Sequence, residues 1–121
     1  MKINKILVVE DDMIIQMFLS RTLSIEGYNI TGEERNCKGA IESIKIDKPD
    51  LVLLDIGIVG DKDGVETAQL INNEYQIPVI FITGNSDKST LERARKTNPI
   101  DFIFKPIDED KLKNRLRELN Q

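Results

Sequence analysis

Short apolar runs alternate with longer segments of helical periodicity along the whole chain. Uninterrupted runs of Ile, Leu and Val, such as residues 6–9 and 51–54, are typical of strands buried on both faces of a parallel sheet. The short segments predict strands at residues 6–9, 28–31, 51–54, 78–83 and 102–104. The segments between and after them predict helices at residues 12–26, 38–46, 65–75, 88–97 and 108–119.

Capping residues support several of these boundaries. Asp12 precedes the first helical segment and is expected to be its N-cap, and Gly27 follows the segment as a C-cap. Three acidic residues, 108–110, open the last helix, where a negative charge is favourable.

The alternation of strand and helix occurs five times. This pattern predicts an α/β fold with a doubly wound parallel sheet and helices on both faces. The 121 residues fit one domain, residues 1–121. Because the fifth helix ends at the end of the chain, we expect no room for an output domain.

Polar residues with useful chemistry follow the predicted strands. In open α/β sheets, sites lie outside the carboxyl ends of the strands. These positions hold Glu10, Asp11, Asp55, Thr83 and Lys105. Each alone has an ordinary explanation as a helix cap, a strand residue or a strand exit. Three carboxylates, a hydroxyl and an ammonium at one rim together predict a functional site.

The acidic residues after the first strand argue against a nucleotide site there. A dinucleotide-binding fold places Gly-rich backbone and a helix N-terminus at this position, whereas Glu10 and Asp11 would repel a phosphate. They would instead bind a hard cation, Mg²⁺ or Mn²⁺, through oxygen ligands. A cation beside Asp55 would then support phosphate chemistry.

Composition excludes several classes of protein. There is no histidine, so His-based catalysis and His metal sites are excluded. The single cysteine, Cys37, excludes a disulfide scaffold and suits a reducing cytoplasm. A net charge of −4 argues against direct nucleic-acid binding. No apolar run approaches the ~20 residues that a membrane span needs.

Five motifs resemble those of response regulator receiver domains of two-component systems, including chemotaxis regulators. They are residues 6–12 (ILVVEDD), 49–55 (PDLVLLD), 63–64 (DG), 80–84 (IFITG) and 102–106 (FIFKP). The resemblance covers essentially the whole chain. It implies a flavodoxin-like (βα)5 fold with strand order 2-1-3-4-5.

The resemblance also implies a role for each matching position. Asp55 resembles the phosphoacceptor, and Asp11, Glu10, Asp55 and the Gly57 carbonyl resemble the magnesium ligands. Thr83 and Lys105 resemble the residues that contact the phosphoryl oxygens. Phe102 resembles the aromatic switch residue.

A receiver of this kind is a signalling switch that catalyses its own phosphorylation and dephosphorylation. The implied phosphodonor is a phosphohistidine on a sensor histidine kinase, or on a histidine phosphotransfer protein in a phosphorelay. The implied oligomeric state is a monomer or a phosphorylation-dependent dimer.

The first helix is too apolar for a helix that covers only one face of a sheet. Ile15, Leu19 and Leu23 follow an i, i+4, i+8 pattern and are predicted to face the core. Ile14 and Phe18 form a second pair rotated away from it, which predicts a partner surface. The family resemblance implies that this face, with Pro106, packs on the kinase. The alternative is that the loop after the last strand covers both residues.

Three departures from the family pattern concern the active-site loops. Val59 stands where the family usually has proline, and the loop from Asp55 to Gly64 is one residue longer than usual. Gly57 lacks the side chain that many members carry, and the resemblance implies that this position and Asn85 set the lifetime of the phosphorylated state.

Three alternative functions fit the sequence less well. A receiver-like interaction module that is not phosphorylated would not need the intact set of strand-end residues. A haloacid-dehalogenase-like phosphatase would need a second Asp where Gly57 stands. A flavodoxin-like electron carrier is excluded by the acidic first loop and the absence of Trp.

Overall fold

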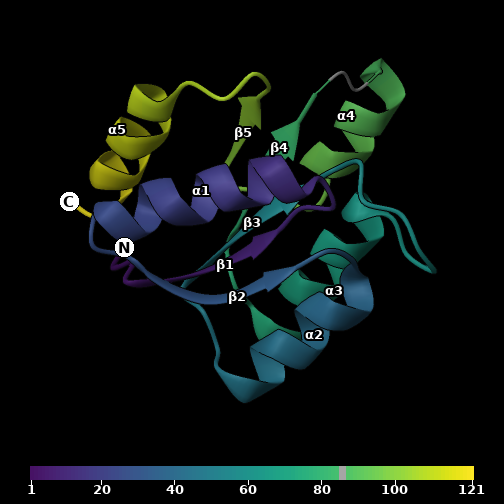
Figure 1. The fold of residues 1–121 in the computed structure, drawn as a ribbon. Coiled ribbons are helices and arrows are strands. Elements are labelled where there is room, and N and C mark those ends of the chain that lie inside the picture. Colours follow the sequence, from purple (N-terminus) through teal and green to yellow (C-terminus); the bar gives the residue numbers. More distant parts are fainter. Residues whose placement is uncertain (85–86) are drawn as a thin grey trace.

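Five strands alternate with five helices in the computed structural model, which describes residues 1–84 and 87–121. The strands are β1 (Lys5–Val9), β2 (Asn29–Glu34), β3 (Leu51–Asp55), β4 (Val79–Thr83) and β5 (Asp101–Phe104). The helices are α1 (Met13–Ile25), α2 (Cys37–Ile46), α3 (Gly64–Tyr75), α4 (Lys88–Arg95) and α5 (Glu109–Leu119). The expected order of elements is therefore confirmed (Figure 1).

The strands form one parallel sheet in the order β2-β1-β3-β4-β5, as expected. Helices α1 and α5 pack on one face, and α2, α3 and α4 pack on the other (Figure 1). Because all the strands run in the same direction, their carboxyl ends meet at one edge of the sheet. This edge is where a site is expected in such folds.

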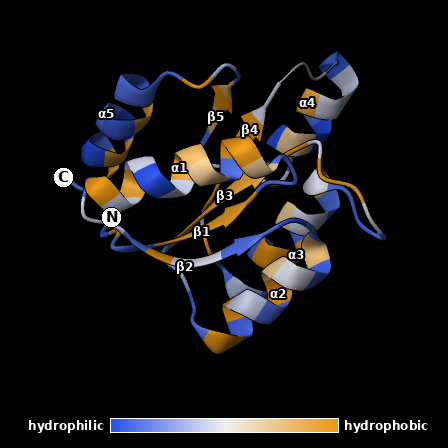
Figure 2. Cartoon of the chain, in the orientation of Figure 1, coloured by the Kyte–Doolittle hydropathy of each residue, from blue (hydrophilic) through white to orange (hydrophobic). Residues whose placement is uncertain are grey.

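Alternate residues of each central strand enter two separate hydrophobic cores. Leu7 and Val9 of β1 face the core under α2, α3 and α4, whereas Ile6 and Val8 face the core under α1 and α5. Side chains along a strand alternate between faces, so a strand covered on both sides must be apolar throughout. Figure 2 shows the resulting hydrophobic strands between the two helical layers.

Two boundaries differ from the prediction by two residues or more. Strand β2 continues to Glu34, because its pairing with β1 extends through Glu33 and Glu34. This edge strand is partly exposed and polar, so no apolar run marks its length. Helix α4 ends at Arg95, where the Thr97 hydroxyl donates to the Ala94 carbonyl and Asn98 adopts a φ of 57°.

The buried face of α1 is more polar than predicted. Leu19 and Leu23 are fully buried as expected, but Ile15 is only half-buried, and Gln16 and Thr22 complete the buried face. Periodicity alone did not indicate this, because burial of an amide or a hydroxyl depends on partners from other elements. Among the described residues, no helix is both long and apolar enough to cross a bilayer.

Candidate functional site

Three carboxylates converge at the carboxyl edge of the sheet: Glu10, Asp11 and Asp55, called here the acidic cluster. One oxygen from each lies within 4.8 Å of the others. The cause is the register of β1 and β3, in which Val9 pairs with Leu54, so the next residues along both strands are neighbours. Glu10 and Asp55 are buried, at 1% and 5% exposure, while Asp11 is partly exposed. The carboxylates of the acidic cluster are therefore largely shielded from solvent.

Lys105 supplies the counter-charge to the acidic cluster. Its ammonium lies 3.0 Å from Glu10 Oε1 and 3.5 Å from Asp55 Oδ2. The Lys105 backbone N–H donates to the Thr83 carbonyl at 2.8 Å, which fixes the residue at the end of β5 beside β4. Thr83 is itself buried, at 1% exposure. The carboxyl ends of β1, β3, β4 and β5 therefore all contribute residues to this site.

Burial and crowding perturb the pKa values in this site. Burial, together with the hydrogen bond and charge of Asp55, raises the pKa of Glu10 to about 7, although Lys105 and the Asp12 backbone N–H oppose the rise. Burial lowers the pKa of Lys105, but its hydrogen bond to Glu10 and the charge of Asp55 outweigh this and hold the pKa above its ordinary value. Lys105 thus remains a cation.

The loop after β3 orients the Asp55 carboxylate. The Gly57 N–H donates to Asp55 Oδ1 at 3.0 Å, which leaves Oδ2 on the side of Lys105. Gly64 packs directly on the backbone of Ile56, where a Cβ would collide with it. Asp63 caps α3 through a reciprocal capping box with Glu66. The Asp-Gly pair in the sequence therefore has two structural roles: Asp63 caps α3, and Gly64 lets the loop pack closely on Ile56.

The donor atoms of the acidic cluster fit a hard divalent cation. Carboxylate oxygens are the ligands that Mg²⁺ prefers. Three carboxylates face one ammonium among the described residues here, so an excess of negative charge favours cation binding. The Gly57 carbonyl as a further ligand stays a prediction.

Known proteins with matching sequences identify the family. The family model for the response regulator receiver domain matches residues 6–117. The chain belongs to this family. It is a receiver domain of the kind found in two-component response regulators, as the sequence motifs predicted.

Two sequence relatives illustrate the match. This receiver domain is 36% identical over 118 residues to the transcriptional regulatory protein KdpE of Staphylococcus aureus, covering 98% of this chain and 50% of that protein. It is 33% identical over 103 residues to the transcriptional regulatory protein PdtaR of Mycobacterium tuberculosis, covering 85% of this chain and 50% of that protein. The chain thus spans about half the length of these curated relatives.

Solved structures agree with the assignment. The signal receiver domain of a modulated diguanylate cyclase from Desulfovibrio desulfuricans G20 is 32% identical, with a TM-score of 0.91. The match covers 98% of this chain and 94% of that one. The receiver domain of NtrX from Brucella abortus is 30% identical, with a TM-score of 0.86 and coverage of 95% and 97%.

The predicted switch pair of this receiver domain lies on one face of the sheet. The register places Phe102 opposite Phe81 and Phe104 opposite Thr83, so Phe102 lies diagonally from Thr83. Phe102 is half-buried as expected, stacks on Phe81 with 5.5 Å between ring centroids, and lies 5.9 Å below the Arg95 guanidinium.

Sequence reasoning missed three features around this pair. It overlooked Phe104, which is 56% exposed, and the contacts of Phe102 with Phe81 and Arg95. The FIF triplet was a signal for Phe104, because alternate residues of a strand share a face.

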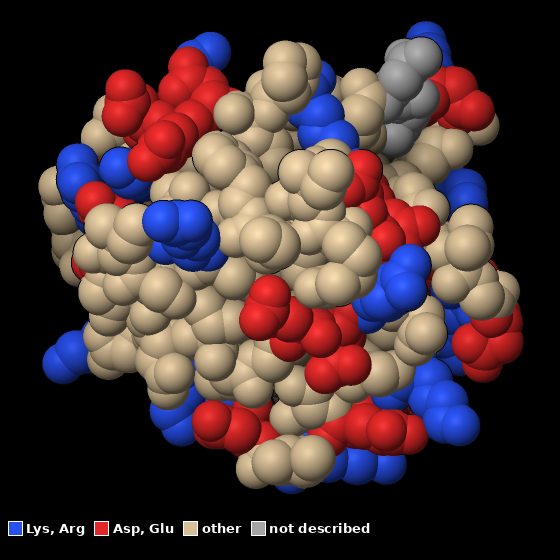
Figure 3. All heavy atoms as spheres, viewed as in Figure 1, with Lys and Arg blue, Asp and Glu red and all other residues tan. Residues whose placement is uncertain are grey.

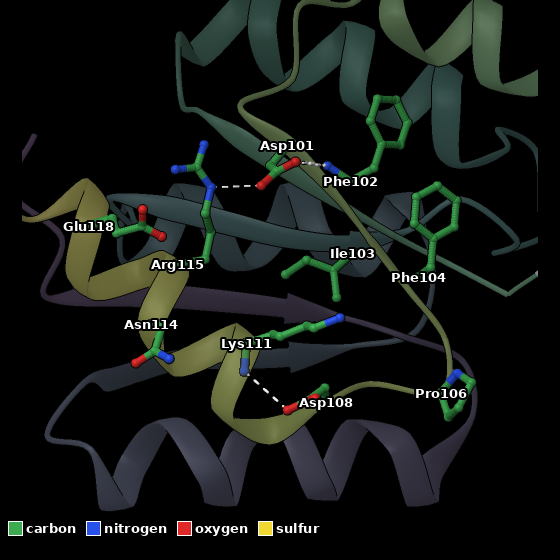
Figure 4. A pocket seen from close by; sticks show the side chains of 10 residues that line it. All are labelled: Asp101, Phe102, Ile103, Phe104, Pro106, Asp108, Lys111, Asn114, Arg115 and Glu118. Carbon is green, nitrogen blue, oxygen red and sulfur yellow. Dashed lines mark hydrogen bonds and ion pairs between the residues drawn. The ribbon is translucent and has the colours of Figure 1, made fainter.

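A hollow of about 450 Å³ lies between β5 and α5 of the receiver domain (Figure 4). The Asp101–Arg115 ion pair, at 2.7 Å, connects the strand and the helix that form it. The side chains of Phe102 and Phe104 point away from α5, toward the other face of β5 (Figure 4). The residues that line this hollow include none of the acidic cluster.

The exposed face of α1 matches the expected pattern. Ile14 is 80% exposed and Phe18 is 37% exposed, whereas Ile15 is half-buried and Leu19 is fully buried. Ile14 and Phe18 line a hollow of about 330 Å³ together with Lys105, Pro106 and Ile107. Figure 3 shows a largely uncharged surface over α1. The loop after β5 therefore borders these side chains without covering them.

All three departures from the family pattern lie within residues 55–64, which the structure describes. Val59 is 72% exposed, and a Cβ at Gly57 would make ordinary van der Waals contact with Asp55 Oδ1, at 3.5 Å. Asn85 lies outside the described residues.

A pH dependence follows from the raised pKa of Glu10. Without metal, burial favours the protonated form of Glu10 below a pH of about 7, so its contribution to stability is present below its unfolded pKa and is lost as pH rises toward about 7. Mg²⁺ needs the ionised form. We therefore expect the rise in melting temperature caused by Mg²⁺ to be larger at pH 8 than at pH 5.5. Thermal unfolding with and without Mg²⁺ at both values tests this, and an equal or smaller rise at pH 8 would contradict it.

Proposed function

We propose that this receiver domain, residues 1–121, accepts a phosphoryl group on Asp55 in a Mg²⁺-dependent reaction. The donor is a phosphohistidine on a sensor histidine kinase or a histidine phosphotransfer protein. The observation that carries the proposal is the convergence of the acidic cluster with Lys105 at 3.0 and 3.5 Å. The proposed compartment is the cytoplasm, where the buried thiol of Cys37 would stay reduced.

In the proposed step, a carboxylate oxygen of Asp55 attacks phosphorus. A P–O bond to Asp55 forms while the P–N bond to the donor imidazole breaks, and the imidazole nitrogen takes the electron pair and a proton from solvent. A bound Mg²⁺, held by Glu10, Asp11 and Asp55, supplies charge neutralisation for the phosphoryl oxygens.

The protein itself contributes position and charge. The Gly57 N–H holds one Asp55 oxygen at 3.0 Å, so the carboxylate has a fixed orientation. Lys105 supplies an ammonium for a phosphoryl oxygen, and Thr83 supplies a hydroxyl at the neighbouring strand end. A carboxylate is a weak nucleophile, so positioning and neutralisation are the main sources of rate.

Incubation with acetyl phosphate and Mg²⁺, followed by intact-mass measurement, tests this function. We expect the mass of one added phosphoryl group, located on Asp55 by peptide mapping. A receiver-like module that only binds partners would gain no mass. A haloacid-dehalogenase-like phosphatase would release phosphate without a stable adduct, and Gly57 lacks the general acid that such chemistry uses.

The switch proposal couples phosphorylation to Phe102. We expect beryllofluoride, as a phosphoryl analogue, to draw the Thr83 hydroxyl toward the acidic cluster and to let the Phe102 ring leave Phe81. The ligand shifts this equilibrium because it binds one arrangement better. Structures with and without beryllofluoride test this, and the ring of Phe81, which is fully buried, serves as the fixed reference. An unmoved Phe102 ring would argue against the switch.

The docking proposal assigns the kinase to the exposed face of α1. Ile14 and Phe18 line an apolar hollow that is also lined by Pro106 and by Lys105 of the active site. A helical partner seated there would bring its phosphohistidine close to Asp55. Exposed apolar side chains beside an active site are the feature that supports this assignment.

Phe18→Ala is expected to slow transfer from the kinase severalfold, while labelling by acetyl phosphate stays unchanged, because the small donor needs no docking surface. Ile25→Ala is the matched control, since Ile25 is 73% exposed at the other end of the same helix. Both transfer rates, measured for both variants, test the proposal. Equal losses with the two donors would mean that Phe18 supports the fold.

A further inference from the structure

Gln16 is a buried amide on a helix face that otherwise packs on the sheet. It is 4% exposed and lies one turn into α1. Burial of an amide has a free-energy cost unless its polar atoms are hydrogen-bonded. An apolar side chain of similar size would fill the same space without that cost. The hydrogen bonds of the Gln16 amide therefore indicate its role.

The Gln16 side chain joins the ends of two strands beside the acidic cluster. Its Nε2 donates to the Glu10 carbonyl at 3.1 Å and to the Glu34 carbonyl at 3.0 Å. The Glu10 N–H also donates to the Glu34 carbonyl at 2.9 Å. The backbone of Glu10 is therefore held on both its N–H and its carbonyl.

Asp11, the next residue along the chain, is also hydrogen-bonded through its backbone carbonyl. Arg35, just after β2, donates from Nη2 to the Asp11 carbonyl at 3.2 Å. Adjacent carbonyls of Glu10 and Asp11 thus each accept a bond from a side chain.

We propose that Gln16 is a positioning residue that sets the placement of Glu10 and Asp11 relative to Asp55 by binding the Glu10 carbonyl. This inference rests on the metal site of the proposed function. Residues that orient metal ligands typically change metal affinity by about 10–100-fold when they are replaced. The same geometry would govern where the phosphoryl group sits.

The test compares two substitutions on the same buried face of α1. Gln16→Met keeps the length and removes the donor, while Thr22→Val removes a buried hydroxyl farther from the site, at 6% exposure. The two positions are six residues apart in the helix, which is about 9 Å along its axis. Mg²⁺ affinity, measured by titration calorimetry on the folded proteins, is the main readout, with labelling by acetyl phosphate as a second.

We expect Gln16→Met to weaken Mg²⁺ binding roughly tenfold and to slow labelling. Thr22→Val should change either quantity less than about twofold, because the hydroxyl that it removes lies farther from the site. Unchanged Mg²⁺ affinity in Gln16→Met, or an equal loss in Thr22→Val, would overturn the proposal. Failure of the unaltered chain to bind Mg²⁺ would instead refute the metal site itself.

Discussion

Asp55→Asn is expected to abolish labelling by acetyl phosphate. The substitution replaces a carboxylate oxygen with an amide, so no nucleophile remains at the end of β3, and it removes one ligand of the acidic cluster. We expect a loss of at least about a hundredfold in the labelling rate, because transfer depends on this group. Intact-mass measurement over time gives the rate.

Asp50→Asn is the matched control, because Asp50 precedes the other end of the same strand. Its Oδ2 accepts from the N–H groups of Asn4 and Lys5 at 2.9 Å, far from the site chemistry. An Asn side chain retains a carbonyl oxygen for these bonds. Labelling should persist in this variant. A label retained in Asp55→Asn would mean that another residue is the phosphoacceptor and would refute the proposed function.

Asp11→Asn is expected to weaken Mg²⁺ binding by at least about tenfold. Asp11 is the most exposed member of the acidic cluster, and its oxygen lies within 4.8 Å of those of Glu10 and Asp55. A unit charge about 4 Å from an ion contributes roughly 1–4 kcal/mol between bulk water and a protein surface, and 1.4 kcal/mol is a factor of ten. Titration calorimetry with Mg²⁺ gives the affinity.

The neighbouring Asp12 provides the control for this change. Its Oδ1 accepts from the N–H groups of Ile14 and Ile15, so Asp12 caps α1 as predicted. Asn is also a good N-cap, and Asp12→Asn should therefore leave both stability and Mg²⁺ affinity nearly unchanged. If Asp11→Asn binds Mg²⁺ as tightly as the unaltered chain, Asp11 is not a ligand.

Local sequence patterns determined the fold and the members of the acidic cluster. Continuous apolar runs such as residues 51–54 indicate strands buried on both faces, and their alternation with helical segments implies a parallel sheet. Since parallel strands end at one edge, Glu10, Asp11 and Asp55 could be expected to lie together before any coordinates were known.

Tertiary structure decided how the surrounding side chains support the site. The burial of Gln16 depends on carbonyls of β1 and β2, and the stacking of Phe102 depends on its register with β4 and on Arg95 from α4. The last residues of β2 are part of the strand because they pair with β1, although no apolar run marks them in the sequence. Periodicity reports which face of an element is buried, whereas these contacts join residues far apart in the chain, so only the folded arrangement determines them.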